Sequence, residues 1–291
     1  MSLATVQGAA DRLPPSLPTP PGRLRSLWSA VARRRGLREF LFIGLVYAMY
    51  DGSRFIVAGK QSTAFAHAVS VLDLEDSLNF AWEKTLNEIV SAHALLAVPA
   101  DYIYATLHYL VTPLVLIWMW RRHRPHYARA RTTLMVATVI GLVGFSLLPV
   151  APPRMLPGFV DTMAQYSTAG WWGSDASAPR GVGSFTNQFA AMPSLHVGWA
   201  LWCGWQLVVH GRRMTTRIAG VAYPALITIV VIATGNHYLL DAIAGAAVVL
   251  LAMVAVRGVA ALRPRPRVID LTEDEAPDLA APIPSQGGRR V

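Results

Sequence analysis

Cysteine and charged side chains are scarce in this sequence, and each scarcity excludes a class of protein. The 291 residues include one cysteine, Cys203, so neither an intrachain disulfide nor a multi-cysteine metal site is possible within one chain. Cys203 lies in an apolar stretch, where we expect a small buried hydrophobic residue. Charged residues make up 15% of the chain and hydrophobic residues 53%. This composition excludes an ordinary soluble domain and favours a polytopic membrane protein.

Lysine is also rare, since only two of the 26 basic residues are lysines and the net charge of +9 comes from arginine. A basic excess can indicate nucleic-acid binding when basic residues are interleaved with polar and aromatic ones. Here the arginines lie between apolar stretches, so we expect no nucleic-acid partner. The sequence also lacks an internal repeat of the kind found in inverted-repeat transporters.

Six apolar stretches are predicted to cross the membrane, which gives an all-α bundle of six transmembrane helices. These stretches cover residues 37–58, 93–120, 132–150, 194–209, 218–233 and 237–256. The segment 59–94 alternates acidic and apolar residues and is too polar to cross. We expect it to form an amphipathic helix that lies at the membrane interface.

The two ends of the chain differ from this apolar body. Residues 1–36 are rich in proline and arginine and predict a disordered basic arm. Residues 259–291 combine a Pro-Arg run with an acidic run and predict a disordered cytoplasmic tail. Residues 37–258 are therefore predicted to be one membrane domain, whose functional core covers residues 95–257.

Basic residues also predict the orientation of the bundle, because cytoplasmic loops carry the excess of Lys and Arg. The amino-terminal arm, the tail and the connections 121–131 and 210–217 are basic, whereas 59–94 and 151–193 are not. We therefore expect a plasma-membrane protein with both termini in the cytoplasm. Arg154, His196 and His237 then all lie at the extracytoplasmic face, although they belong to three separate parts of the chain.

Two histidines, His196 and His237, stand at the external mouths of predicted helices. Neutral His237 could attack a phosphorus atom, and Asp241, four residues on along the same helix face, could accept the second imidazole N–H. His196 could then protonate the departing oxygen. Arg154 and the helix start at Ser194 could hold the phosphate oxygens. The pattern predicts a phosphoester site between the two mouths.

Three motifs, Ala151-Pro-Pro-Arg154, Ala191-Met-Pro-Ser-Leu-His196 and His237-x-x-x-Asp241, resemble those of the type 2 phosphatidic acid phosphatase superfamily. They are most similar to its inositol phosphorylceramide synthase-like branch, which has a six-helix core and an active site at the outer membrane face. The resemblance implies that His237 forms a phosphohistidine and that Asp241 orients it. It also implies His196 as general acid, Arg154 as phosphate ligand, and neither a metal nor another cofactor.

The sequence departs from the phosphatase branch at three positions. Leu147 stands where that branch has a lysine, Leu195 where it has a glycine, and Val231 where it has an arginine. Two phosphate-binding cations are therefore missing. We expect Arg180 and Arg54 to supply the charge instead, although an ion pair between Arg54 and its neighbour Asp51 is an equal alternative for that arginine.

The expected partners are a lipid phosphoester substrate, the surrounding membrane lipids, and an acceptor that is either water or a lipid or polyol hydroxyl. The motifs do not distinguish hydrolysis from transfer. A lipid-phosphate carrier and a non-catalytic membrane scaffold are the alternatives from other functional classes. A further histidine, His108, lies within the span 93–120, where a packing role and a functional role both remain open.

Overall fold

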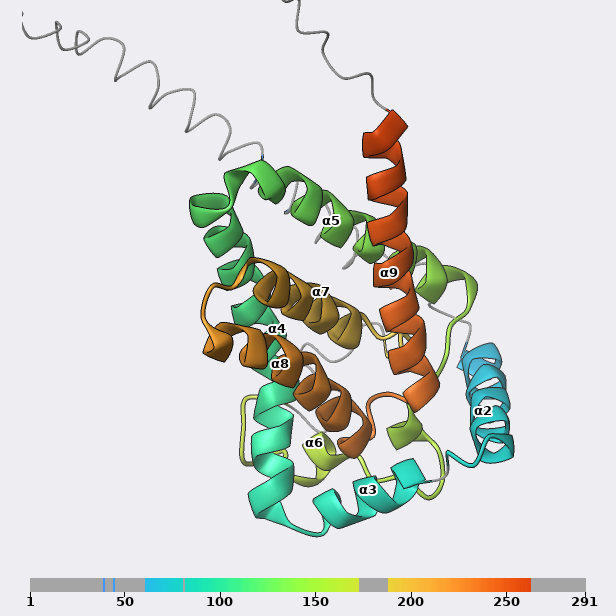
Figure 1. Cartoon of the computed structure of the whole chain (residues 1–291). Helices are drawn as coiled ribbons and strands as arrows, with labels where there is room; N and C mark the ends of the chain where they lie inside the picture. The colour runs from blue at the N-terminus through green and yellow to red at the C-terminus, as the bar shows by residue number, and fades with distance from the viewer. Residues whose placement is uncertain (1–38, 40–43, 45–60, 81, 173–187, 263–291) are drawn as a thin grey trace, which may run out of the picture.

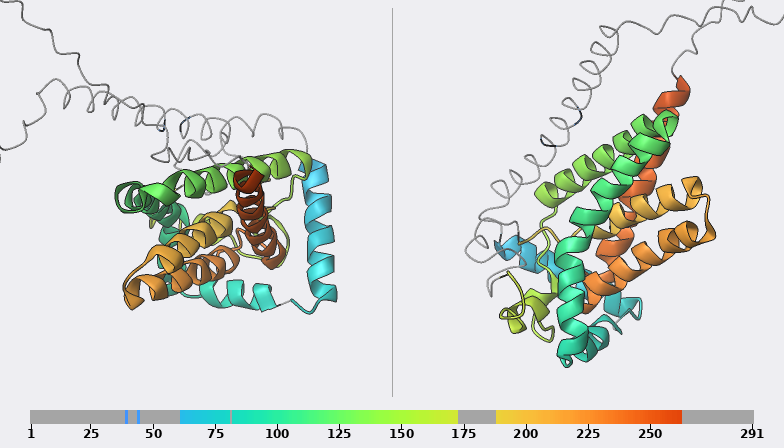
Figure 2. Two further views of the ribbon diagram at one scale, coloured as in Figure 1. Left: turned by 45° about the horizontal axis from the view of Figure 1, so that its top comes forward. Right: turned by 90° about the vertical axis from the view of Figure 1, so that its left-hand side faces the viewer.

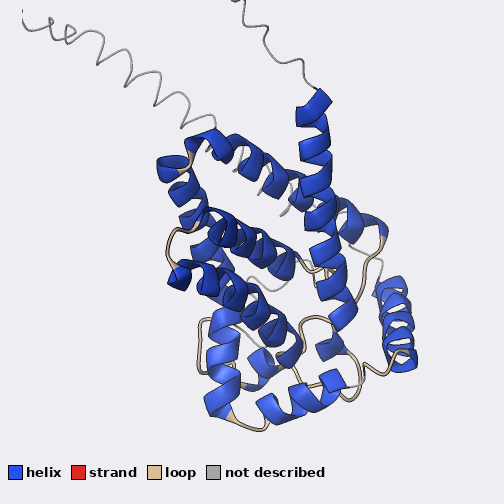
Figure 3. Cartoon of the chain, viewed as in Figure 1, coloured by secondary structure: helices blue, strands red, loops and turns tan. Residues whose placement is uncertain are grey.

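The computed structural model describes residues 39, 44, 61–80, 82–172 and 188–262. Within these ranges the chain folds into eight α-helices and one 3₁₀ turn, and it contains no strand beyond an isolated bridge between Val150 and Ala190 (Figure 3). The prediction of an all-α fold is confirmed. The predicted first span, 37–58, and both terminal segments lie almost wholly outside the described residues.

Four helices in the described ranges are long and apolar enough to cross a membrane. They are α4 (Ala94–Arg122), α5 (Arg124–Leu147), α8 (Met214–Ala233) and α9 (Leu239–Leu262). With a rise of 1.5 Å per residue, helices of this length extend about 30 to 44 Å, which matches the thickness of a bilayer core. Four of the six predicted spans are therefore confirmed as helices fit to cross a membrane.

The fourth predicted span, 194–209, forms α7 (Leu195–His210), whose 16 residues extend only about 24 Å. In Figure 1 this helix lies in the middle of the bundle, and it packs against α4, α5, α8 and α9. Glycines permit the close approach of α7 and α8, because a Cβ built on Gly204 would lie 2.2 Å from the Gly220 carbonyl oxygen. Cys203 is buried beside Thr112 in this core, as predicted.

The arginine-rich segment 121–131, predicted as a loop, is helical except at His123. A single residue, His123, separates α4 from α5, so most of these arginines lie on the last turn of α4 or the first turns of α5. Figure 1 shows this α4–α5 corner and the carboxyl end of α9 at the top of the molecule. The start of α4 and the start of α9 lie at the opposite end.

The predicted amphipathic segment forms two helices rather than one, α2 (Gln61–Ser77) and α3 (Trp82–Ser91). Asn79 adopts a left-handed backbone conformation, with φ of 59°, between them. Asparagine tolerates this conformation better than most residues, which explains the change of direction there. The views in Figure 2 show α3 across one end of the bundle and α2 at its side, near the start of α9.

The described part of the connection after α5 runs through residue 172 and folds over the same end of the bundle as α3. It contains a 3₁₀ turn, η1 (Pro153–Met155), and a short helix, α6 (Thr162–Gln165). The Thr162 hydroxyl donates a hydrogen bond of 2.6 Å to Asp101 on α4, which attaches α6 to the bundle. Trp172 is fully buried and packs edge-on against Tyr102, also on α4. The loop is thereby held over the starts of α4 and α9.

Candidate active site

The three sequence motifs meet at one end of the bundle. The Arg154 N–H donates to the Gly235 carbonyl at 2.8 Å, which ties the first motif to the third. The Ser194 N–H donates to the Asp241 carbonyl at 2.9 Å, which ties the second motif to the third. The rings of His196 and His237 lie 5.6 Å apart between their centroids. Side chains from α7, α9 and the loop after α5 therefore form one cluster.

The imidazole of His237 is oriented chiefly by a backbone carbonyl. Its Nδ1 atom lies 2.9 Å from the carbonyl oxygen of Ala191 and 3.4 Å from Oδ2 of Asp241. A carbonyl oxygen only accepts hydrogen bonds, so Nδ1 carries the proton and the neutral ring has its lone pair on Nε2. The sequence suggested Asp241 as the partner of this N–H. Ala191 belongs to the second motif, but its role could not be predicted because it comes from the main chain.

Asp241 has a second contact that fixes the beginning of α9. Its Oδ2 atom accepts a hydrogen bond of 2.9 Å from the Tyr238 N–H, three residues earlier. An acidic residue at this helix position commonly binds back to the N–H that precedes the helix. Asp241 therefore lies against both the His237 ring and the backbone that carries it.

His196 lies among aromatic side chains from α4. Tyr104 stacks on it at 4.6 Å between ring centroids, and His108 contacts it edge-on at 4.4 Å. The Nδ1 atom of His108 lies 3.1 Å from the Tyr104 carbonyl, one turn earlier on the same helix. His108, for which sequence left packing and function open, therefore belongs to the wall of this site.

Arg154 is held on two edges of its guanidinium group. Nη1 donates to Oδ1 of Asn236 at 2.5 Å, and Nε pairs with Asp161 at 3.3 Å. Asn236 in turn donates to the Thr234 hydroxyl at 2.8 Å. Neither Asn236 nor Asp161 was among the residues predicted for the site. The planar guanidinium group is thus fixed in one orientation next to Asn236, which directly precedes His237.

Ser194 is buried and begins α7 as its N-cap. Its Oγ atom accepts a long hydrogen bond of 3.4 Å from the Val197 N–H. Serine is among the residues that helices prefer at this position, because its oxygen satisfies a backbone donor of the first turn. The contact accounts for Ser194 structurally, and its predicted binding of phosphate stays a prediction.

Two further acidic residues lie at the start of α9. Glu83 on α3 accepts a hydrogen bond from the Leu239 N–H, and Glu75 on α2 accepts one of 2.7 Å from the Leu240 N–H. Burial raises the pKa of Glu75, and burial together with the Glu75 carboxyl raises the pKa of Glu83 to about 9. The only sequence signal for them was the acidic character of the segment 59–94.

The departures from the phosphatase motifs fall at apolar positions. Val231 is fully buried in the main core, and Leu195 packs with Phe145 and against Gly141. Leu147 is 76% exposed near the end of α5. The proposed replacement cations, Arg54 and Arg180, lie outside the described residues.

The apolar helices are long enough to span a membrane, which defines a membrane protein. Two histidines, an aspartate and an arginine lie together at one end of the bundle and form a candidate phosphoester site. The model of the PAP2 superfamily matches residues 69–255, and the chain belongs to this superfamily. Neither the curated proteins nor the solved structures gave a significant match.

Membership confirms the predicted superfamily and supports a membrane phosphatase or phosphotransferase that acts on lipid phosphates. The matched region begins at residue 69, before the predicted core of 95–257. It therefore includes Glu75 and Glu83 as well as the three motifs.

Proposed function

We propose that this protein transfers or hydrolyses a lipid phosphoester through a phosphohistidine on His237, at the extracytoplasmic face of the plasma membrane. The observation that carries the proposal is the 2.9 Å contact between Nδ1 of His237 and the Ala191 carbonyl. It holds the proton on Nδ1 and leaves the Nε2 lone pair to attack phosphorus. His196, at 5.6 Å, is the nearby group that can exchange a proton with the reacting oxygens.

In the first step, Nε2 of His237 forms a bond to phosphorus while the bond from phosphorus to the leaving oxygen breaks. Protonated His196 donates its proton to that oxygen, which leaves as an alcohol. General acid help of this kind contributes about 100- to 10,000-fold in typical enzymes. Arg154 offsets the charge on the other phosphoryl oxygens, while Asp241 and the Ala191 carbonyl stabilise the N–H side of the modified ring.

In the second step, neutral His196 accepts a proton from the acceptor hydroxyl, whose oxygen attacks phosphorus. The bond between phosphorus and Nε2 breaks, and His237 returns to its neutral form. Water as acceptor gives hydrolysis, whereas a lipid or polyol hydroxyl gives transfer. Leu195 and Val231, in place of the glycine and arginine of the phosphatase branch, favour an inositolphosphotransferase-like enzyme, but the motifs themselves do not decide between transfer and hydrolysis.

The test uses purified protein and a membrane lipid extract labelled with radioactive phosphorus. We expect wild-type protein to move the label and to carry an acid-labile, alkali-stable phosphoryl group, and His237→Ala to do neither. His126→Ala, an exposed histidine at the opposite end of the bundle, is the matched control and should behave as wild type.

The products then distinguish the reactions. Label released as free phosphate indicates a phosphatase, and label in a new lipid indicates a transferase whose acceptor can be identified. If wild type and His237→Ala give the same products, the catalytic role of His237 is wrong. A carrier or a scaffold would then be the better explanation of the fold.

A further inference from the structure

Two glutamates, remote in sequence from every motif of the site, bind the main chain next to the proposed nucleophile. Glu75 and Glu83 are 1% and 2% exposed, and one oxygen of each carboxyl group accepts a backbone N–H from the first turn of α9. Together with Asp241, which binds the Tyr238 N–H, they occupy three consecutive donors that directly follow His237. The position of this turn sets the position of the histidine.

The two carboxyl groups also influence each other. The second oxygen of each, Oε2, is buried and has no hydrogen-bond partner among the described residues, and each carboxyl group shifts the pKa of the other. A hydrogen bond between two carboxyl groups requires one proton, because an ionised carboxylate only accepts. Burial and mutual repulsion both favour retention of that proton at neutral pH, in line with the pKa of about 9 for Glu83.

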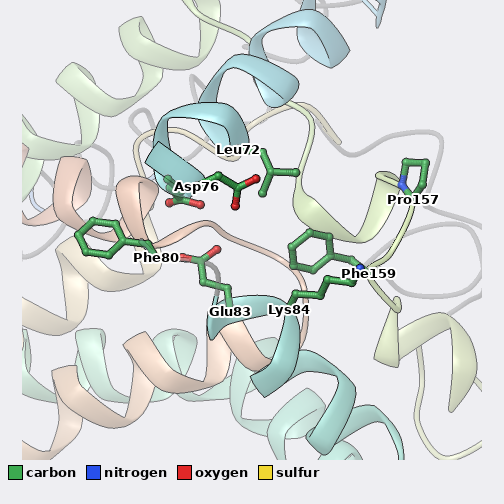
Figure 4. Close-up of a pocket in the computed structure, with 8 residues that line it drawn as sticks. Leu72, Asp76, Phe80, Glu83, Lys84, Pro157 and Phe159 are labelled. Carbon is green, nitrogen blue, oxygen red and sulfur yellow. The ribbon is translucent and has the colours of Figure 1, made fainter. Parts of the chain in front are cut away.

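Both glutamates line a pocket of about 170 Å³ between α2, α3 and the loop after η1. Figure 4 shows the Glu83 carboxyl pointing toward α2, where Asp76 lies, with Phe159 and Lys84 beside it. Among the described residues, the charged or titratable groups around the pair are Asp76 on α2, Lys84 on α3, Asp241 on α9, and Tyr238 just before α9. Only Lys84 among them is cationic, so negative charge predominates around the pair.

We propose that Glu75 and Glu83 are positioning residues that share one proton and thereby hold the first turn of α9 so that His237 stays against the Ala191 carbonyl. The proposal rests on the proposed function of His237. Loss of the shared proton places two carboxylates side by side and separates α2 from α3. The start of α9 then shifts, and the Nε2 atom of His237 leaves its attacking position.

The decisive variant is Glu83→Gln. The glutamine carbonyl can still accept from the Leu239 N–H, and its NH₂ group can donate to Glu75 at any pH, as the shared proton does. We expect wild-type kcat to fall above about pH 9 and the kcat of Glu83→Gln to persist there. Glu83→Ala, which removes both bonds, should lose roughly tenfold to hundredfold in kcat at neutral pH with little change in KM, since small misplacements of reacting groups have costs of this size.

Glu88→Gln, an exposed position on the same helix, is the matched control and should keep the wild-type pH profile. An identical alkaline limb in wild type and Glu83→Gln would overturn the positioning role. Wild-type turnover in Glu83→Ala would overturn it as well.

A second measurement does not depend on activity. The infrared band of a protonated carboxyl group should disappear from wild type above about pH 9 and should be missing from the Glu83→Gln difference spectrum. If no such band titrates, the shared proton is refuted. If the band titrates but no phosphoester is turned over at any pH, the proposed function is wrong while the carboxyl pair stands.

Discussion

At the scale of residues, the contacts that hold the site together come from groups to which the sequence assigned no role. The Ala191 carbonyl sets the tautomer of His237, and Asn236 with Asp161 sets the plane of Arg154. The carbonyl next to the buried histidine adds information that the motif lacks, because a proton on Nδ1 leaves only Nε2 with a lone pair.

The fixed plane of Arg154 gives a first prediction. Lysine keeps the charge but cannot reach Asn236 and Asp161 together in the geometry of a guanidinium group. We expect Arg154→Lys to reduce kcat/KM about 100-fold, which corresponds to about 3 kcal/mol of transition-state stabilisation. Steady-state kinetics on the labelled lipid measures this change, with the exposed Arg129→Lys as control. A loss below about threefold would show that charge alone suffices.

The missing phosphate-binding cations give a second prediction at this scale. We expect Arg54→Gln and Arg180→Gln each to reduce turnover far more than they reduce the amount of protein in the membrane, because a phosphoryl group needs charge that Leu147 and Val231 cannot supply. Turnover per molecule, normalised by immunoblot, is the measurement. Unchanged turnover for either variant removes that arginine from the site.

At the scale of elements, the site depends on how closely α7 and α9 cross. A Cβ built on Gly245 of α9 would lie 2.1 Å from the Ser194 carbonyl oxygen, at the start of α7. The obstacle is backbone on both sides, so neither helix can yield by a change of side-chain rotamer. This crossing holds Ser194 and Asp241 together, and through them the second and third motifs.

Gly245→Ala therefore should separate the two helix starts. We expect a loss of about 1–3 kcal/mol in stability, as for other overpacked positions, and a loss of activity at temperatures where the variant is still folded. Gly258→Ala on the same helix is the control, because its Cβ has no atom within 4 Å, and it should be neutral or slightly stabilising. Thermal unfolding in detergent, followed by tryptophan fluorescence, compares the two. Equal melting temperatures would contradict the close crossing.

The carboxyl pair between α2 and α3 predicts how stability depends on pH. The folded-state pKa of Glu83, about 9, lies above its ordinary value of 4.5, so between these limits the folded state binds more protons than the unfolded state. The contribution of this group to the free energy of unfolding is greatest below about pH 4.5 and falls as pH rises toward 9. We expect the melting temperature of wild type to fall more steeply over this range than that of Glu83→Gln. Parallel curves for the two proteins would count against the pair.

At the scale of the whole molecule, the arginines of the α4–α5 corner lie at the end of the bundle opposite the candidate site. The α4–α5 corner with its arginines and the end of α9 lie at one end, and the starts of α4 and α9 lie at the other (Figure 1). With the positive-inside rule, this polarity supports our proposal that His196 and His237 lie at the extracytoplasmic face.

Reporter fusions test this orientation. A reporter active only outside the cytoplasm should be active when fused at about residue 170, in the loop over the site, and silent at about residue 126, in the α4–α5 corner. The opposite pattern would place the site in the cytoplasm and would exclude an external lipid headgroup as the substrate.

The sequence by itself determined the apolar helices, the three motifs and the superfamily, because these depend on hydrophobic composition and on local spacing along the chain. It missed the two-helix form of the segment 59–94, where the turn at Asn79 and the burial of Glu75 and Glu83 interrupt a single stripe.

Only the tertiary structure decided which groups hold the His237 ring and the start of α9. Glu83 and Glu75 bind backbone donors that lie 156 and 165 residues away, and the Ala191 carbonyl binds a ring 46 residues away. Main-chain donors and acceptors are the same in every residue except proline, so the sequence does not show which of them will be used. Their partners are set only when helices pack and each buried polar group must find a bond.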